Sequence, residues 1–266
     1  MLRPRIIPCL LVHKKGLVKT VNFKAHKYVG DPINAVRIFN EKQVDELMVL
    51  DIDASVENRE PDYQMIENLA AECRMPLCYG GGVKTSTQAQ RIFSLGVEKI
   101  AFSSAIVEKP ELVSELADQV GCQSVVAVLD VKKKLLGGYE VFTKNGRLSA
   151  KVKPVELIKK FSALGAGEIV INSIDNDGMM KGYDLSLIEL CRASTDLPMT
   201  VLGGAGSLDH IGELIHRHGI IGAAAGSLFV FKGTYRAVLI NYPTPIQKRE
   251  LLQKHLQPTE PIAELA

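Results

Sequence analysis

Short apolar segments alternate with longer amphipathic segments along the whole chain. The short segments are nearly continuous in Val, Ile and Leu, as expected of parallel strands that are buried on both faces. They predict strands at Arg5–Val12, Glu46–Ile52, Leu77–Tyr79, Lys99–Phe102, Ser124–Asp130, Glu168–Ile171, Met199–Leu202 and Ile221–Ala225. The longer segments repeat apolar residues at helical spacing. They predict helices at Ile33–Gln43, Tyr63–Cys73, Ser86–Ser94, Pro110–Val120, Pro154–Leu164 and Leu208–His216, with both prolines in a first helical turn.

Eight strands separated by helices indicate an α/β protein, and more specifically a closed (β/α)8 TIM barrel. The chain has 266 residues, a length that one such barrel occupies. No linker-like stretch divides it, so we expect a single domain over residues 1–266. Within it we expect half-barrels at about 1–122 and 123–245, followed by a helical tail to 266.

The half-barrels are predicted by an internal repeat of roughly 120 residues. Four motifs of the first half return in the same order in the second. Cys9–Val12 returns as Val128–Val131, Asp51–Ser55 as Asp175–Gly178, Tyr79–Gly82 as Leu202–Gly206, and Ala101–Ala105 as Ala224–Leu228. Two segments depart from the regular alternation. His13–Asp31 reads as a long polar connection and a candidate lid, and Lys132–Thr143 as a hairpin that turns at Gly137-Gly138.

Charge and composition argue against several classes of partner. The chain carries 32 basic and 30 acidic residues, so it lacks the broad positive field that attracts nucleic acid or a membrane surface. No apolar run reaches 18 residues, and the five cysteines are scattered and odd in number. We therefore expect a cytoplasmic protein with free thiols, and we expect no metal and no cofactor.

Glycine runs follow the third and seventh predicted strands. Gly80–Gly82 and Gly203–Gly206 each precede a predicted helix, so backbone N–H groups and the helix start can converge on an anion. Ser103-Ser104 and Gly226-Ser227 follow the next strand in each half. A single glycine run is equally explained by a tight turn. Because the arrangement occurs twice, the sequence predicts two phosphate sites.

Three aspartates end predicted strands at the face where barrels carry their active sites. We interpret Asp130 as a candidate acid or base, since it lies centrally with Lys132 nearby. Asp51 and Asp175 are interpreted as structural residues that accept backbone N–H bonds in the following turns.

Together these motifs resemble one family. The segments that carry the resemblance are Arg5–Leu10, Asp45–Leu47, Asp51–Ser55, Gly80–Gly82, Ser173–Gly178 and Gly203–Gly206. They look like the cyclase subunit of imidazole glycerol phosphate synthase, the HisF family, over residues 1 to about 240. The resemblance implies a substrate with two phosphates, ammonia from a glutaminase subunit docked at the amino-terminal face, and an acid/base pair of aspartates. It also implies a set of substrate- or phosphate-binding residues: Lys19, Gly81, Gly82, Ser103, Ser104, Asp177, Gly178, Gly203, Gly204, Gly226 and Ser227.

The sequence departs from the family pattern at the acid/base pair. Asp130 matches the second aspartate, but Leu11 occupies the position of the first. Leucine can neither transfer a proton nor accept a hydrogen bond, and the loss of such a group slows a reaction by about 100- to 10,000-fold. His13 is the alternative proton carrier that the sequence leaves open. Three further positions differ from the family near the expected phosphates: Ala101, Ser103 and Leu202.

Four charged residues begin predicted strands at the opposite end of the barrel. The resemblance implies that Arg5, Glu46, Lys99 and Glu168 form the salt-bridge gate through which ammonia enters. Without the resemblance, the four residues are better explained as solvated charges at the strand ends. Glu98 matches an acidic position at the glutaminase interface.

The sequence thus predicts a HisF-like synthase subunit that receives ammonia for nitrogen incorporation into a phosphorylated substrate. Since the acid/base pair is incomplete, we expect a paralogue that serves amidino-sugar formation in surface polysaccharides, with a separate sugar amidotransferase as a further partner. One alternative is an authentic cyclase of histidine biosynthesis. The other is a scaffold, not an enzyme, that activates a glutaminase.

Overall fold

The computed structural model describes residues 3–255. Parallel strands close into a barrel, in which the last strand pairs with the first through Arg5 and Gly222. Within that range the barrel strands are β1 (Arg5–His13), β4 (Leu47–Asp51), β5 (Leu77–Gly80), β6 (Lys99–Phe102), β7 (Val125–Lys133), β10 (Glu168–Ser173), β11 (Met199–Leu202) and β12 (Gly222–Ala225). The predicted (β/α)8 TIM barrel is confirmed, and each predicted strand is present with ends shifted by at most a few residues.

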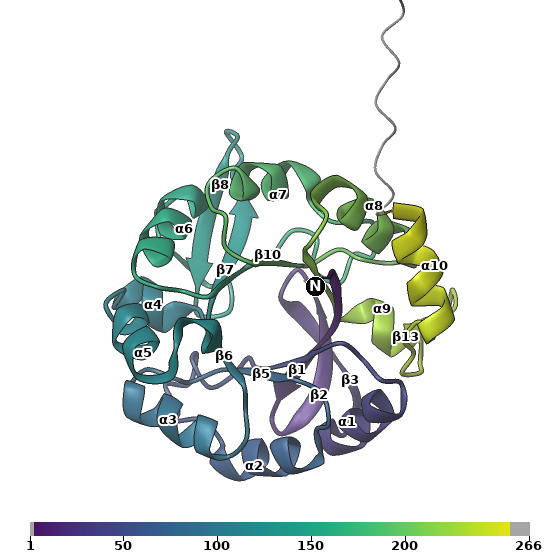
Figure 1. The fold of residues 1–266 in the computed structure, drawn as a ribbon, viewed down its shortest axis with the longest axis horizontal. Coiled ribbons are helices and arrows are strands. Elements are labelled where there is room, and N and C mark those ends of the chain that lie inside the picture. The colour runs from purple at the N-terminus through teal and green to yellow at the C-terminus, as the bar shows by residue number, and fades with distance from the viewer. Residues whose placement is uncertain (1–2, 256–266) are drawn as a thin grey trace, which may run out of the picture.

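Helices form a ring outside the strands (Figure 1). They are α1 (Pro32–Glu41), α2 (Tyr63–Glu72), α3 (Ser86–Ser94), α5 (Leu112–Val120), α6 (Pro154–Ala163), α7 (Leu185–Arg192) and α8 (Leu208–His218), with the short α4 (Ser104–Glu108), α9 (Ser227–Val230) and a 3-10 turn at Cys122–Ser124. Side-chain caps explain several starts: Asp31, Asp62, Thr85, Asp184 and Ser207 each accept a hydrogen bond from the first turn. Pro154 opens α6 as expected, whereas Pro110 lies before α5 in the preceding turn, so that prediction was wrong.

Strand alternation divides the buried side chains into two groups. One side of each strand packs against the helices, and the other side faces the barrel lumen. The lumen group, called the inner cluster below, consists of Ile7, Cys9, Met48, Cys78, Ala101, Val126, Val128, Val170, Leu202 and Ala224. Its side chains are small or medium-sized and carry no nitrogen or oxygen.

The segment predicted as a polar loop and lid is instead folded into strands. β2 (Gly16–Val21) pairs with the end of β1 and with β3 (Lys24–Gly30), forming an antiparallel ribbon that we call the lid ribbon. Its inner residues Leu17–Thr20 are buried, which the lysines on either side obscured in the sequence. The second excursion is a hairpin as predicted, in which β7 turns through Gly137-Gly138 into β8 (Tyr139–Thr143), with β9 (Leu148–Ser149) beside it.

Both halves therefore open with a barrel strand that continues into antiparallel strands, while the division into half-barrels stays a prediction. After the barrel come the short pair β13 (Phe231–Lys232) and β14 (Ala237–Val238) and then α10 (Pro245–His255), which packs against α8. The helical tail is thus present to His255, and its predicted continuation to 266 lies outside the described residues. No helix within 3–255 is long and apolar enough to cross a membrane.

Candidate functional site

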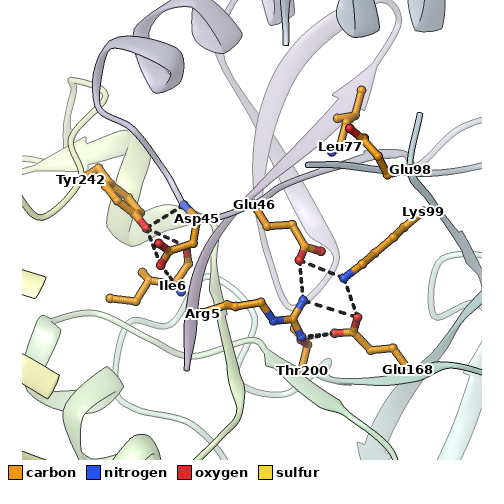
Figure 2. Close-up of polar contacts among 10 residues, drawn as sticks. All are labelled: Arg5, Ile6, Asp45, Glu46, Leu77, Glu98, Lys99, Glu168, Thr200 and Tyr242. Carbon is orange, nitrogen blue, oxygen red and sulfur yellow. Dashed lines mark hydrogen bonds and ion pairs between the residues drawn. The ribbon is translucent and has the colours of Figure 1, made fainter. Parts of the chain in front are cut away.

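The four predicted gate residues meet across the floor of the barrel, and Figure 2 shows their ion pairs. The Arg5 guanidinium contacts Glu46 and also Glu168 at 2.6 Å. Lys99 Nζ lies 3.0 Å from Glu46 Oε2 and 2.9 Å from Glu168 Oε2. Each cation contacts both carboxylates, so the four side chains form a closed ring of alternating charge, which we call the floor ring.

Mutual attraction keeps the floor ring charged. Burial alone would raise the pKa of Glu168, but Arg5 and Lys99 outweigh burial and hold that pKa below its ordinary value. Burial would likewise lower the pKa of Lys99, but Glu168 and Glu46 raise it above its usual range. Because both carboxylates are nearly inaccessible to solvent, the ring is a bound network and not a set of solvated strand ends.

Thr200 adds a neutral member to the floor ring (Figure 2). Its hydroxyl donates to Glu168 Oε1 at 2.6 Å and accepts from Arg5 Nη2 at 3.3 Å. A Cβ at the neighbouring Gly222 would collide with this hydroxyl. The glycine therefore allows the threonine to reach the ring.

A second network ties the ends of the chain together beside the floor ring (Figure 2). Asp45, which precedes Glu46, accepts hydrogen bonds from the backbone N–H of Ile6 at 3.0 Å and from Lys248 Nζ of α10 at 2.8 Å. The Tyr242 hydroxyl donates to the carbonyl of Ile6 at 2.8 Å. This fixes the starts of β1 and β4 relative to each other.

Glu98, the predicted interface residue, lies on the same outer face next to Lys99. One of its carboxylate oxygens accepts from the backbone N–H of Leu77 at 2.8 Å. A shallow groove lies beside it, lined by Phe93, Val97, Glu98, Lys99, Val120, Gln123 and Ser124.

The opposite end of the lumen opens into a cavity of about 1070 Å³, including the part open to solvent. We call it the mouth cavity. Among the residues that line it are Leu11, Lys19, Gly81, Ser103, Ser104, Asp130, Asn172, Asp177, Gly178, Gly203, Gly204, Gly226 and Ser227. All predicted catalytic and phosphate-binding residues meet there except Gly82, which packs instead against Ala54 and Arg59. Within residues 3–255 no group of three His, Cys, Asp or Glu side chains is placed to hold a metal ion.

Two equivalent glycines bring the backbone to the rim of the mouth cavity. Gly81 and Gly203 both have positive φ, at 126° and 95°. A Cβ would lie 2.5 Å from the carbonyl oxygen of Asp51 at Gly81, and 2.6 Å from that of Ser173 at Gly203. Glycine is therefore required at both positions, and each leaves its loop open to an anion in the cavity.

Asp130 is the acidic group at the centre of the mouth cavity. Its carboxylate accepts from Asn172 Nδ2 at 2.9 Å and from Ser103 Oγ at 3.3 Å. Burial raises its pKa to about 6, against the lowering effect of these two hydrogen bonds. A carboxyl group with this pKa can exchange a proton near neutral pH. Lys132, which was expected near Asp130, is exposed, and its side chain lies over the ring of Phe142 instead.

The other candidates for proton transfer have structural contacts. Asp51 accepts from the backbone N–H groups of Asp53 and Ala54, and Asp175 accepts from that of Lys133, as interpreted from the sequence. His13 Nδ1 lies 2.7 Å from Asp53 Oδ1 and is not among the residues that line the mouth cavity. The structure therefore places His13 against Asp53 and outside the cavity wall.

The wall of the mouth cavity is polar on one side and apolar on the other. Asp130 and Asn172 are directly paired across β7 and β10. The corresponding pair across β1 and β4 is Leu11 and Leu50. Leu11 is therefore accompanied by a second apolar residue on the adjacent strand.

The lid ribbon is docked over the mouth cavity. The Thr20 hydroxyl donates to Asp177 Oδ2 at 2.6 Å, and Asn22 Nδ2 donates to the carbonyl oxygen of Asp175 at 2.6 Å. Lys19 points inward and is 4% exposed. Its Nζ donates to the carbonyl oxygen of Cys9 at 2.5 Å, and burial lowers the pKa of Lys19. The same Nζ would lie 2.7 Å from a Cβ added at Gly226, so the absence of a side chain there leaves room for the lysine.

Asn172 and Thr200 were not predicted from the sequence. Both are polar residues at lumen-facing positions of apolar strands, and that alternation was the available signal: Asn172 follows Glu168 and Val170 at even spacing. The predicted strand ended one residue too early to include Asn172.

Fold and site together define a class: a (β/α)8 barrel with a charged ring across one end of its lumen and a glycine-rimmed polar cavity at the other. Residues 5–236 match the family described as histidine biosynthesis protein. The chain belongs to that family, and within it to the HisF family.

Its relatives carry names of one kind. A Vibrio vulnificus protein named "putative imidazole glycerol phosphate synthase subunit hisF3" is 58% identical over 254 residues, which cover 95% of this chain and 98% of that protein. A Leptospira interrogans protein named "putative imidazole glycerol phosphate synthase subunit HisF" is 56% identical over 252 residues, 94% and 99% of the two chains. The similarly named "subunit hisF2" of Pseudomonas aeruginosa is 52% identical over 243 residues, 91% and 97% of the two chains.

Proposed function

We propose that this protein is a HisF-like synthase subunit that receives ammonia from a glutaminase and delivers it for nitrogen incorporation into a phosphorylated substrate. The observation that carries the proposal is the order of three features along one lumen: the floor ring, the apolar inner cluster, and the mouth cavity. Neutral ammonia passes an apolar lumen more readily than ammonium, because an unpaired charge is strongly disfavoured there. The names of the relatives support a glutaminase as partner.

The floor ring supports this role because it has little value as a stabilising device. Two carboxylates and two cations lose their hydration when the ring forms, and buried ion pairs of this kind contribute little net stability. We assign the ring to ammonia entry and the outer face with Glu98 to glutaminase docking. The glycine loops and Lys19 are assigned to phosphate binding.

The incomplete acid/base pair points to a specialised paralogue. Asp130 is available for proton transfer, but the corresponding positions on β1 and β4 are Leu11 and Leu50, which carry no proton, and the nearby Asp51 accepts backbone hydrogen bonds. We infer that the protein acts in the cytoplasm, where its barrel conducts ammonia. That ammonia serves the formation of amidino sugars for surface polysaccharides. A separate sugar amidotransferase then carries out the transfer.

The deciding experiment supplies the purified barrel with ammonium chloride and the phosphoribosyl substrate of the family. We expect turnover at least about 100-fold below that of an authentic cyclase, because one member of the acid/base pair is missing. Turnover at the family's usual rate would refute the paralogue and establish the runner-up, an authentic cyclase of histidine biosynthesis. That runner-up is favoured by the family match over residues 5–236.

Leu11→Asp separates these functions from a scaffold that only activates a glutaminase. Leu11 lines the mouth cavity, so the new carboxylate would face the site that holds Asp130. A pocket that still binds the family's substrate should gain cyclase activity, whereas a scaffold should gain none. Leu11→Asn, which adds no acid or base, is the matched control.

A further inference from the structure

One buried polar atom of the lumen has no hydrogen-bond partner. Asn172 is 5% exposed, and its Nδ2 donates to Asp130, but its Oδ1 finds no donor within the part of the chain that the structure describes. A buried amide oxygen left unpaired loses its hydration without gaining a hydrogen bond in return, which is unfavourable. An unpaired atom of this kind in a well-packed barrel needs an explanation. One explanation is that a ligand donates the missing hydrogen bond.

The position of that oxygen follows from its neighbour. An ionised carboxylate only accepts hydrogen bonds, so Asn172 must present its nitrogen to Asp130 and its oxygen away from it. Oδ1 lies beside the second glycine loop, where a Cβ on Gly203 would be 3.2 Å from it. Because Glu168, Val170 and Asn172 alternate on β10, the side chain faces the lumen above the inner cluster.

Ammonia that rises from the floor ring would find no side-chain oxygen or nitrogen acceptor in the inner cluster, where sulfur atoms are the only and weaker acceptors. Asn172 and Asp130 supply carbonyl and carboxylate oxygens directly above that cluster. On the opposite wall Leu11 and Leu50 offer none. The acceptors are therefore concentrated on one side of the lumen exit.

We infer that Asn172 Oδ1 and the Asp130 carboxylate form a docking site for ammonia at the exit of the lumen, an inference that rests on the proposed function. Ammonia carries three N–H bonds on one side and a lone pair on the other. When two N–H bonds are donated to these oxygens, the lone pair points away from them toward the open cavity. The site both ends the passage and orients the nucleophile.

The first test needs no acceptor substrate. The side-chain amide of Asn172 is followed by 1H–15N NMR in the intact barrel while ammonium chloride is added at pH 9.5, where about half or more of it is ammonia, and sodium chloride at equal ionic strength is the control. Asn172→Leu identifies the resonance. We expect a saturable shift with ammonium chloride alone. No shift, or the same shift with both salts, overturns the inference.

The second test uses two variants that each remove one donor to Asp130. Asn172→Leu also removes the free acceptor, whereas Ser103→Ala does not. In the complex with glutaminase and amidotransferase, supplied with ammonium instead of glutamine, Asn172→Leu should raise the KM for ammonium about tenfold, the equivalent of one hydrogen bond. Ser103→Ala affects the ammonia site only through Asp130, so it should raise that KM clearly less than Asn172→Leu does, and both variants should raise the pKa of Asp130.

The outcomes separate the two proposals. Equal effects of both variants on the KM for ammonium, or an effect of Asn172→Leu confined to the KM of the acceptor, would contradict the ammonia site. If the wild-type complex makes no product while the NMR shift is present, the proposed function fails and the ammonia site stands.

Discussion

Thr200 and Gly222 are directly paired on β11 and β12, and the missing side chain of Gly222 provides the space for the Thr200 hydroxyl. That hydroxyl holds Glu168 in the floor ring. The glycine that begins β12 is thus coupled, through one threonine, to the charged floor of the barrel.

This coupling predicts the effect of Gly222→Ala. The new methyl group should displace the Thr200 hydroxyl and destabilise the fold by about 1–3 kcal/mol, or several degrees in melting temperature. Thr200→Ala in the same chain should recover part of the loss, because the colliding hydroxyl is gone. Thermal denaturation of the single and double variants checks this, and additive losses would contradict the proposed collision.

Lys99→Met should loosen the floor ring without adding a charge. Glu46 and Glu168 would then share Arg5 alone, so we expect a destabilisation of about 2 kcal/mol, below the usual loss for a fully buried pair because Lys99 retains some exposure. The matched control is Lys109→Met, whose ion pair with Glu115 is exposed and is worth at most about 1 kcal/mol.

The same pair of variants tests the proposed gate in the complex with glutaminase. Lys99→Met should let glutamine hydrolysis proceed while product formation falls, and Lys109→Met should leave the ratio of product to glutamate unchanged. A ratio that is the same in both variants would assign the ring a structural role only.

The raised pKa of Asp130 predicts how stability depends on pH. The carboxyl group titrates at about 6 in the folded protein against 3.8 ordinarily, so the folded state binds its proton more tightly. The protonated carboxyl group therefore contributes fully to the stability of the folded state below about pH 4. This contribution is lost as the pH rises through 6. At pH 7.5 Asp130→Asn should therefore be more stable than the wild type by about 1–2 kcal/mol, since the carboxylate borders an open cavity and a full two-unit shift is an upper bound.

Urea denaturation at several pH values measures this difference. The advantage of Asp130→Asn should shrink toward zero as the pH approaches 4. A variant that is less stable at pH 7.5, or an advantage that does not change with pH, would show that hydrogen bonding outweighs burial at this site.

The lid ribbon should loosen when its main anchor is removed. Thr20→Val replaces the hydroxyl that donates to Asp177 and keeps a similar shape. Loss of a hydrogen bond to a carboxylate is worth about 1.5 kcal/mol or more, so hydrogen exchange of amides in 16–30 should accelerate roughly tenfold. Inorganic phosphate should slow that exchange in the wild type, since it offers an anion to the buried Lys19. Exchange in β10 serves as the internal control.

The barrel could be predicted because short apolar runs identify its strands. The candidate functional side chains lie at the ends of those strands. This is why Asp130 and the paired glycines were found from the strand pattern, whereas the four charges of the floor ring were expected to meet only because of the family resemblance. The lid ribbon was not predicted, because the lysines around Leu17–Thr20 hide a buried strand in what reads as a polar loop. The different surroundings of Gly81 and Gly82 could not be predicted, because adjacent glycines on one loop face different neighbours, which no spacing rule distinguishes.

The roles of Asn172 and Thr200 required three-dimensional information. Each side chain matters through a residue on another strand, Asp130 for Asn172 and Glu168 for Thr200. Period alone places such a residue inside the barrel. It does not identify which neighbour the residue contacts or whether one of its atoms is left unpaired.

The network around Asp45 places the beginning of the chain beside the floor of the barrel. Arg3 lies 3.8 Å from Asp45, whose backbone neighbour Glu46 belongs to the floor ring. Any purification tag or fusion partner attached ahead of Arg3 will emerge on the surface that we assign to the glutaminase. Untagged protein, or a tag that is cleaved before mixing, is therefore the appropriate material for reconstituting the complex.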